Sequence, residues 1–269
     1  MVSPVDGRIR SLAAALPLDR VPRFTCWLLA AAAAIPLPLI AQLSGASGDG
    51  FLFRRPAVSF AVRGGYDRPL AGSDIFDFTT TQLTLDRRDF AAFAYQVDLG
   101  VRLSDRWEIV LSGGDAKRSV PSEFRTFVDN NERPIEQSTT LRRAPITLGV
   151  NYALTAPGDR IGKFAWIPAR FSPWVGVGVG RMNYSFSQVG DFVDFQTLRV
   201  FSRTFRSSGM TPLGYGRVGA DFMLTQRIAL TGDLRYTAAQ PARMSEAFQG
   251  FRKIDLSGGA ATMGFTVRY

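Results

Sequence analysis

The sequence predicts an all-β fold, a closed antiparallel up-and-down transmembrane β-barrel of eight strands, with ten strands as the alternative. Three observations predict this fold. Segments in which apolar and polar residues alternate with a period of two recur through the chain, as expected of strands with one apolar face. The connections between these segments alternate between short and long. An apolar leader precedes them, and no later stretch is apolar and long enough for a transmembrane helix.

The leader is the uncharged run FTCWLLAAAAAIPLPLI, residues 24–40. Arg20 and Arg23 precede it, and small polar residues follow it. A basic flank, an apolar core and a small-residue cleavage region are the three parts of a secretory signal. We therefore expect residues 1–46 to be a cleaved signal peptide and residues 47–269 to form the barrel domain. An uncleaved membrane anchor is the alternative, but the run is short for a span and two prolines interrupt it.

Eight segments show the period-two pattern. In FAYQVDLGVRLS (93–104) every odd-numbered residue is apolar and every even-numbered residue is small or polar. The eight expected strands are 56–66, 93–104, 107–114, 144–154, 171–186, 215–224, 227–237 and 254–269. In the fifth, the phase of the alternation changes near Arg181, which predicts a β-bulge.

The connections predict which ends of the strands share a side of the membrane. Two turns are short, residues 104–106 and 225–227, and a third connection, 156–169, is of medium length. Four connections are long and polar: 67–89, 116–140, 188–209 and 238–253. Short turns on one side and long loops on the other are typical of outer-membrane barrels. The first loop contains IFDFTTTQLTL, which could itself be extended; ten strands would result if this stretch and the third loop both crossed the membrane.

The chain ends in GFTVRY, where Gly264, Val267 and Tyr269 fit the pattern Gly-x-x-apolar-x-aromatic. With this ending and the strand pattern, residues 51–269 resemble the small eight-stranded outer-membrane barrels of the OmpA, OmpX and OmpW type. In such families the last strand carries an assembly signal of this form. The resemblance implies a location in the outer membrane of a Gram-negative cell envelope. It also implies membrane lipids, lipopolysaccharide and the barrel-assembly machinery as partners.

An eight-stranded barrel is just wide enough for side chains to fill it. The predicted inward face carries four acids and five arginines, a near balance of charge: Asp98, Glu108, Asp221, Asp233, Arg63, Arg102, Arg217, Arg235 and Arg268. Charges removed from bulk water must pair or be neutralised. We therefore expect a salt-bridged polar network that fills the lumen. A passive channel for small or hydrophobic molecules is the alternative.

The composition argues against several kinds of chemistry. The chain has no histidine, and its single cysteine, Cys26, lies in the leader. The usual nucleophile pairs and histidine-type metal sites are therefore missing. We expect no catalytic residue, no cofactor and no metal, and a lipid-modifying enzyme is the least favoured function. The net charge of +9 comes mostly from scattered arginines, so nucleic acid is not an expected partner.

The third loop combines aromatic and basic residues: Phe192, Phe195, Arg199, Phe201, Arg203 and Phe205. Apolar side chains exposed on a loop usually indicate contact with something else. The sequence therefore suggests a contact surface and, for the protein, a structural or surface-binding role. The alternative is that the strands continue above the membrane and the loops pack on one another.

Overall fold

The structure is a computed structural model and describes residues 55–129, 132–161, 165–195, 197, 199–251 and 253–269. The expected signal peptide, residues 1–46, lies outside the described residues.

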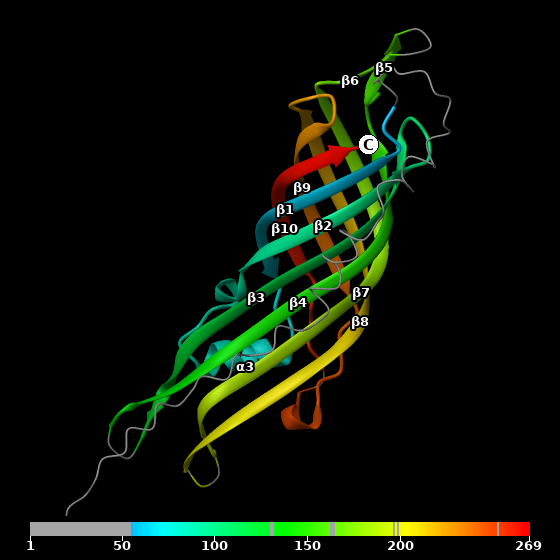
Figure 1. Ribbon diagram of the computed structural model, residues 1–269. Helices are drawn as coiled ribbons and strands as arrows, with labels where there is room; N and C mark the ends of the chain where they lie inside the picture. The colour runs from blue at the N-terminus through cyan, green and yellow to red at the C-terminus, as the bar shows by residue number, and fades with distance from the viewer. Residues whose placement is uncertain (1–54, 130–131, 162–164, 196, 198, 252) are drawn as a thin grey trace, which may run out of the picture. The chain divides into compact units, whose positions relative to one another are not determined.

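Eight antiparallel strands form a closed ring in the order β1-β10-β9-β8-β7-β4-β3-β2 (Figure 1). Their bounds are β1 (Val58–Pro69), β2 (Ala92–Arg102), β3 (Trp107–Val128), β4 (Pro134–Ala153), β7 (Phe171–Val193), β8 (Val200–Met223), β9 (Ile228–Ala239) and β10 (Gly258–Arg268). A separate two-stranded hairpin, β5 (Gly158–Ile161) and β6 (Ala165–Pro168), interrupts the connection between β4 and β7. The prediction of an eight-stranded closed barrel is confirmed, and the ten-stranded alternative is wrong.

The last strand closes the ring by pairing with the first. The register of β1 and β10 runs from Ser59 opposite Arg268 to Pro69 opposite Gly258. The pairing continues at Tyr269, whose N–H donates to the Val58 carbonyl oxygen at 2.8 Å. The carboxyl-terminal residues thus leave no free strand edge at this seam.

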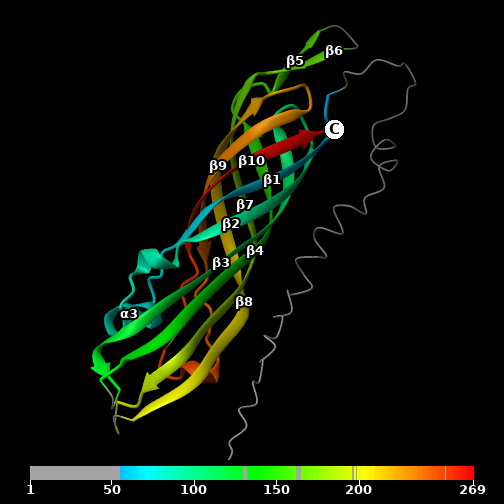
Figure 2. The same ribbon diagram turned by 60° about the vertical axis from the view of Figure 1, so that its left-hand side comes forward.

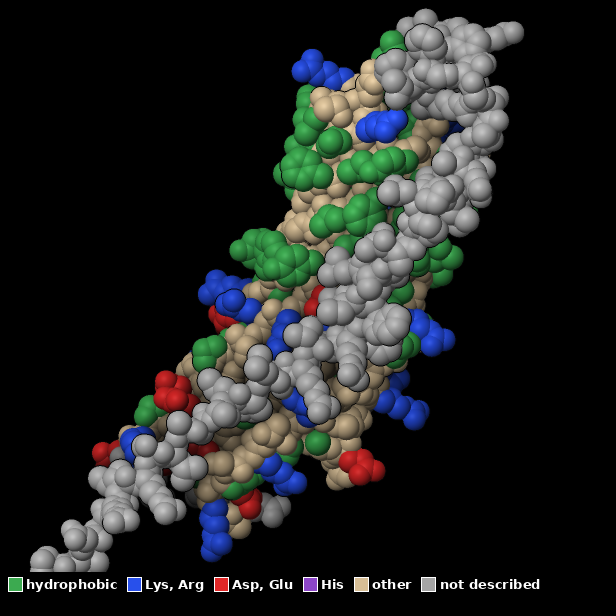
Figure 3. Space-filling view, viewed as in Figure 1, with side chains coloured by type: hydrophobic (Ala, Val, Ile, Leu, Met, Phe, Trp, Pro, Cys, Tyr) green, Lys and Arg blue, Asp and Glu red, His purple; other side chains and the backbone are tan. Residues whose placement is uncertain are grey.

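The outer wall of the barrel is apolar. Most apolar residues of the barrel wall face outward and their neighbours in sequence face the lumen, as in β2, where the two faces alternate without interruption. Large outward side chains with about half of their surface exposed include Val62, Tyr66, Phe93, Leu148, Phe171, Val177, Leu234, Met263 and Phe265. Figure 3 shows hydrophobic side chains across the visible wall of the barrel. Such a wall is stable against hydrocarbon and costly against water.

Aromatic side chains gather near both ends of this wall. At the short-turn end Trp107 packs against Tyr152, with ring centroids 4.8 Å apart, and Phe171 lies opposite Phe222. Toward the loops, Tyr66 meets the edge of Phe93 with centroids 6.3 Å apart. Two aromatic girdles of this kind mark the two interfaces of a membrane.

Four of the strands are about twice as long as the others. β3, β4, β7 and β8 have 20 to 24 residues, whereas β1, β2, β9 and β10 have 11 or 12. The two long hairpins therefore project beyond the other strands on the loop side (Figures 1 and 2). Most of the predicted second and third loops is thus strand.

The bulge predicted near Arg181 is wrong. β7 pairs with both β4 and β8 through this residue without a shift in register. The sequence pattern changes phase because the environment of the inner face changes. Below Arg181 the inward residues are mostly glycines, whereas above it Met182, Tyr184 and Phe186 are inward and buried. An apolar inner face begins there, and the outer face becomes polar.

That apolar inner face belongs to a core that lies over the loop-side mouth of the barrel. We call it the mouth core. Its members include Ile75, Phe76, Phe90, Phe186, Phe248, Ile254 and Leu256, all at most 5% exposed. Phe76 contacts Phe90 and Phe186 edge to face, with centroids 5.1 and 5.8 Å apart. The residues come from the first and fourth loops as well as from the long hairpins.

The first loop contains the helix α3 (Asp74–Gln82), so the expectation that IFDFTTTQLTL is extended is wrong over most of its length. Ile75, Phe76 and Thr79 form its buried face, and acids occupy its first turn. Burial of this apolar face against the mouth core outweighs the strand preference of the three threonines. Leu83 then makes an isolated bridge to Phe124 of β3. Short 3-10 turns, η1 (Arg87–Phe90) and η2 (Glu246–Phe248), complete the cover.

Candidate functional site

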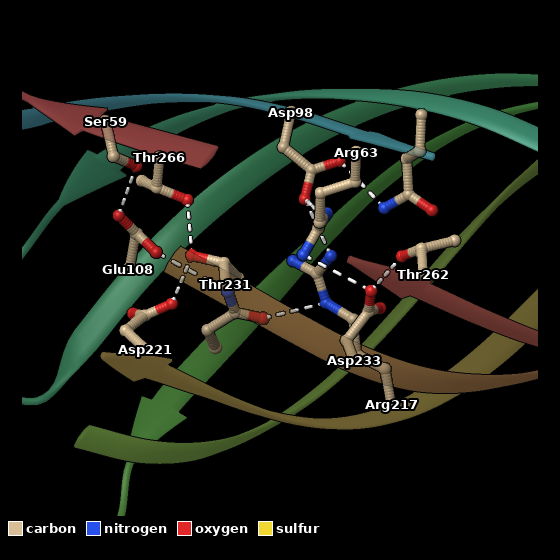
Figure 4. Close-up of polar contacts among 12 residues, drawn as sticks. Ser59, Arg63, Asp98, Glu108, Arg217, Asp221, Thr231, Asp233, Thr262 and Thr266 are labelled. Atoms are coloured by element: carbon tan, nitrogen blue, oxygen red, sulfur yellow. Dashed lines mark hydrogen bonds and ion pairs between the residues drawn. The ribbon is translucent and has the colours of Figure 1, made fainter. Parts of the chain in front are cut away.

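The lumen of the barrel is filled by a network of charged and polar side chains, and its centre is Asp98 (Figure 4). The Asp98 carboxylate pairs with Arg63 and, at 2.8 Å, with Nη1 of Arg217. Arg63 also reaches Oδ1 of Asp233 at 3.4 Å. These four side chains come from four different strands and are at most 8% exposed. Because so little water reaches them, their charges depend on one another for compensation.

Hydroxyl groups and amides bind further atoms at the centre, although Oδ2 of Asp233 has no hydrogen-bond partner among the described residues. Gln96 donates from Nε2 to Oδ1 of Asp98 at 3.0 Å, and Thr262 donates to Asp233. Nε of Arg217 donates to Oδ1 of Asn151 at 3.1 Å. The central ion pairs thus sit within a lattice of hydrogen bonds, as buried charges require.

A second group lies nearer the short-turn end. Arg268 pairs with Asp221, which also accepts a hydrogen bond from Oγ1 of Thr231 at 2.6 Å. Thr231 in turn shares a hydrogen bond with Thr266, also at 2.6 Å. Figure 4 shows Asp221, Thr231 and Thr266 beside the central group. The last strand therefore contributes directly to the lumen network.

Glu108 is held by neutral donors. Its carboxylate accepts hydrogen bonds from Ser59 Oγ at 2.6 Å and from Asn151 Nδ2 at 3.4 Å. Arg102, which lies opposite Glu108 in the register of β2 and β3, has no hydrogen-bond partner for its Nη1 among the described residues. Arg102 and Arg235 are thus the two of the five arginines predicted to face the lumen that form no ion pair among the described residues.

Arg235 enters the network through aromatic rings. Its guanidinium lies 4.4 Å from the centroid of the Tyr215 ring. The Arg217 guanidinium lies 5.7 Å from the same ring and 5.0 Å from that of Trp174. Cation–π contacts of this kind are worth more where water is excluded. Trp174, Arg217, Tyr215 and Arg235 thus form a stack inside the barrel.

Inward glycines make room for this stack. A Cβ on Gly178 would lie 2.7 Å from Cε1 of Tyr215 and 2.6 Å from the carbonyl oxygen of Leu148. A Cβ on Gly176 would lie 3.2 Å from Cγ of Arg217. The GVGVG segment therefore supplies space within the lumen.

Sequence reasoning missed several members of the lumen. Asp67 and Arg143 form a buried ion pair of 2.8 Å at the loop end of the network, but both fell just outside the expected strands. Continuing the period-two pattern by one or two residues would have placed both inward. Tyr215 and Trp174 were missed because large aromatic residues are more common on the lipid-facing side than in a polar lumen.

The remaining predicted residues lie as follows. Val267 and Tyr269 are on the outer wall, with Tyr269 51% exposed. A Cβ on Gly264 would lie 2.6 Å from Cα of Arg63, so only glycine fits this close approach of β10 to β1. In the third loop, Phe195 and Phe201 are 51% and 38% exposed.

Neither a metal centre nor a helical span is formed by the part of the chain that the structure describes. Within it, no three His, Cys, Asp or Glu residues are grouped so that they could hold a metal ion. None of its helices is apolar and long enough to cross a membrane.

Comparison with known proteins identifies similar folds at low sequence identity. No family model and no curated protein matches the chain. The crystal structure of a major outer membrane protein from Thermus thermophilus matches 80% of this chain and 100% of that chain, with a TM-score of 0.49 and 12% identity. Neisserial surface protein A matches 79% of this chain and 96% of that chain, with a TM-score of 0.44 and 11% identity. Outer membrane protein AlkL matches 84% and 95%, with a TM-score of 0.36 and 14% identity.

The structure itself determines the class of protein. A closed antiparallel ring with an apolar outer wall, two aromatic girdles and a polar interior is the architecture of bacterial outer-membrane barrels. The fold is therefore that of a small eight-stranded outer-membrane β-barrel, its wall contacts membrane lipids, and the cell outer membrane is its location.

Proposed function

We propose that this outer-membrane barrel has a structural or surface-binding role and that its lumen does not conduct ions. The observation that carries the proposal is the buried network centred on Asp98. Its ion pairs and the stack on Tyr215 cross the interior from several strands. A hydrated pore would need these side chains to separate, which would leave charges without partners in a narrow interior.

The mouth core supports the same proposal. Fully buried residues of the first loop, such as Phe76 and Leu85, lie with Phe186 of β7 and Ile254 of the fourth loop in one apolar cluster. A solute entering from the loop side would have to open this cluster. Opening it would expose apolar surface at a cost of about 25 cal/mol for each Å².

The surface-binding part of the proposal is supported by aromatic residues at the loop tips. Each of the four loops contributes one phenylalanine to a connected set: Phe78, Phe127, Phe195 and Phe251. Phe192 and Phe205 pack edge to face beside them, with centroids 4.8 Å apart. Exposed aromatic side chains that remain after the loops have packed are typical of a contact surface.

Arginines flank these aromatic residues. The Arg203 guanidinium lies 5.2 Å from the Phe205 ring, and Arg199 is exposed directly before β8. Lipopolysaccharide carries anionic groups at the height of the loops and is our proposed contact. The barrel-assembly machinery is the proposed partner of the carboxyl-terminal strand, and neither nucleic acid nor an enzymatic substrate is proposed. The absence of histidine from the sequence supports a non-enzymatic role.

Single-channel recording in planar bilayers tests the closed lumen. We expect no stable conductance steps from the wild-type protein, whereas a general porin in the same bilayers shows them. The double variant Asp98→Ala and Arg217→Ala removes the centre of the network and should produce conductance bursts if it folds. Heat-modifiable migration on gels reports folding for each protein. Stable wild-type conductance would show that the protein is a passive channel.

The surface role is tested by binding of purified lipopolysaccharide to the protein in phospholipid vesicles. Replacing Phe195 and Phe201 by serine should weaken binding, since both rings are exposed. Replacing Val128, the last residue of β3, which is 60% exposed, is the matched control for a general loss of exposed apolar surface. Equal binding by all three proteins would exclude the aromatic residues of the third loop as the contact.

A further inference from the structure

A small cavity lies at the short-turn end of the lumen, below the charged network. Its volume is about 30 Å³, and it is partly open. Arg102, Arg268, Ser172 and Trp174 contribute to its wall, together with the acids Glu108 and Asp221. A water molecule needs about 10–15 Å³ measured in this way, so the cavity has room for a group of two or three heavy atoms.

The acids of the cavity wall are already engaged. Asp221 pairs with Arg268 and accepts from Thr231. Glu108 accepts from Ser59 and Asn151. The third acid of the wall, Asp105 in the turn, pairs with Arg55 at 2.5 Å. The carboxylate oxygens of these acids therefore already accept hydrogen bonds or ion pairs from other partners.

Two hydrogen-bond donors of the wall have no partner. Nη1 of Arg102 and Oγ of Ser172 are buried atoms without a hydrogen bond among the described residues. Ser172 is only 2% exposed, so its hydroxyl group cannot simply turn to bulk water. Arg268 repels Arg102, whereas Glu108 and Asp221 attract it. Unpaired buried donors, one of which belongs to a guanidinium group, are the features of an anion site.

We propose that this cavity binds a single carboxylate group from the short-turn side of the membrane, which is the periplasmic side. One carboxylate oxygen accepts from Nη1 of Arg102 and the other from Oγ of Ser172. The anion also lowers the repulsion between Arg102 and Arg268. Because the cavity holds no more than the group itself, the rest of a larger molecule stays outside. The site does not depend on the role of the loops, and it is compatible with a closed lumen.

Tryptophan residues provide a direct measurement. Trp107 and Trp174 line the cavity, whereas Trp166 lies in the β5–β6 hairpin and does not. Protein labelled with 5-fluorotryptophan and purified from outer membranes is titrated with sodium acetate, which replaces sodium chloride at constant ionic strength. We expect a saturable change in the fluorine resonance of Trp174 and no change for Trp166.

Variants separate the site from a general effect of salt. Arg102→Gln should weaken acetate binding by about tenfold or more, because a hydrogen bond to a charged group is lost. Ser172→Ala should weaken it by a smaller factor. Arg227→Gln changes an exposed arginine of another periplasmic turn and should bind like the wild type. Heat-modifiable migration verifies that each variant is folded. An absent or non-saturable change in the wild type, or an unchanged affinity in Arg102→Gln, overturns the proposal.

Discussion

Replacing Asp98 by asparagine tests whether the lumen network is a dehydrated, mutually dependent set of charges. Asp98 contacts two guanidinium groups, those of Arg63 and Arg217. Asparagine keeps nearly the same shape and can still bond to Gln96. It removes the negative charge, so Arg217 loses its ion pair and Arg63 keeps only Asp233 at 3.4 Å.

The expected cost follows from the burial of the partners. The side chains of Arg63 and Arg217 are 2% and 0% exposed. Breaking a buried ion pair by removing one partner costs about 3–5 kcal/mol. Because Asp233 still compensates part of the charge of Arg63, we expect a loss near the lower end, about 3 kcal/mol in the free energy of unfolding. Asn151 and the rings around Arg217 do not replace the missing charge.

Reversible denaturant unfolding in phospholipid vesicles, followed by tryptophan fluorescence, measures this loss. The matched control is Asp115→Asn on the outer wall. Asp115 pairs with Arg142 through two contacts of 2.7 and 3.0 Å, but the two side chains are 30% and 26% exposed. The control should cost at most about 1 kcal/mol. If both variants lose the same small amount, water screens the lumen charges and the proposal of a packed network is refuted.

Three further predictions concern other parts of the barrel. Tyr269→Asp should lower the amount of protein assembled in the outer membrane, since Tyr269 lies on the lipid-facing wall. Immunoblots of membrane fractions measure this amount, and a wild-type amount would contradict the role of Tyr269 in an assembly signal. Gly178→Ala should destabilise the barrel by about 1–3 kcal/mol, because the added Cβ would meet Tyr215 and backbone atoms. Gly216→Ala should be neutral, because a Cβ there would have no atom within 4 Å; equal denaturation midpoints of the two variants would refute the packing argument. Phe76→Ala should leave the barrel folded but make the first loop sensitive to protease, because Phe76 is fully buried in the mouth core. Phe78→Ala, at a 38% exposed position, should leave the loop resistant; equal digestion rates of the two variants would count against the mouth core as the cover of the barrel.

The class of fold was predictable because it depends on local patterns. A strand between lipid and a polar interior must alternate with a period of two, and this alternation is visible within a few residues. The outward face of β2 and the inward positions of the nine predicted charges could therefore be assigned without any knowledge of which strands are neighbours. The same period-two pattern, continued by one or two residues beyond the expected strands, also places Asp67 and Arg143 on the inward face.

The helix α3 and the inner face of upper β7 were not predictable in this way. Threonine-rich sequence around Phe76 favours a strand locally, and the helix forms because its apolar face is buried by residues from other loops. Phe186 faces inward although it is apolar, because the environment above the barrel mouth is a core and not a polar lumen. Both outcomes depend on contacts between distant parts of the chain.

The sequence by itself determined that the chain forms a closed membrane barrel, that nine charged residues face inward, and that Tyr269 belongs to an outer wall. The tertiary structure decided which charges meet. Arg63 and Arg217 both reach Asp98, although they are 35 and 119 residues away from it. The heights of inward side chains are set by the register of all eight strands around the ring, and that register is a property of the closed barrel. This is why pairing in the lumen, and the unpaired Nη1 of Arg102 beside the cavity at the short-turn end, became visible only in three dimensions.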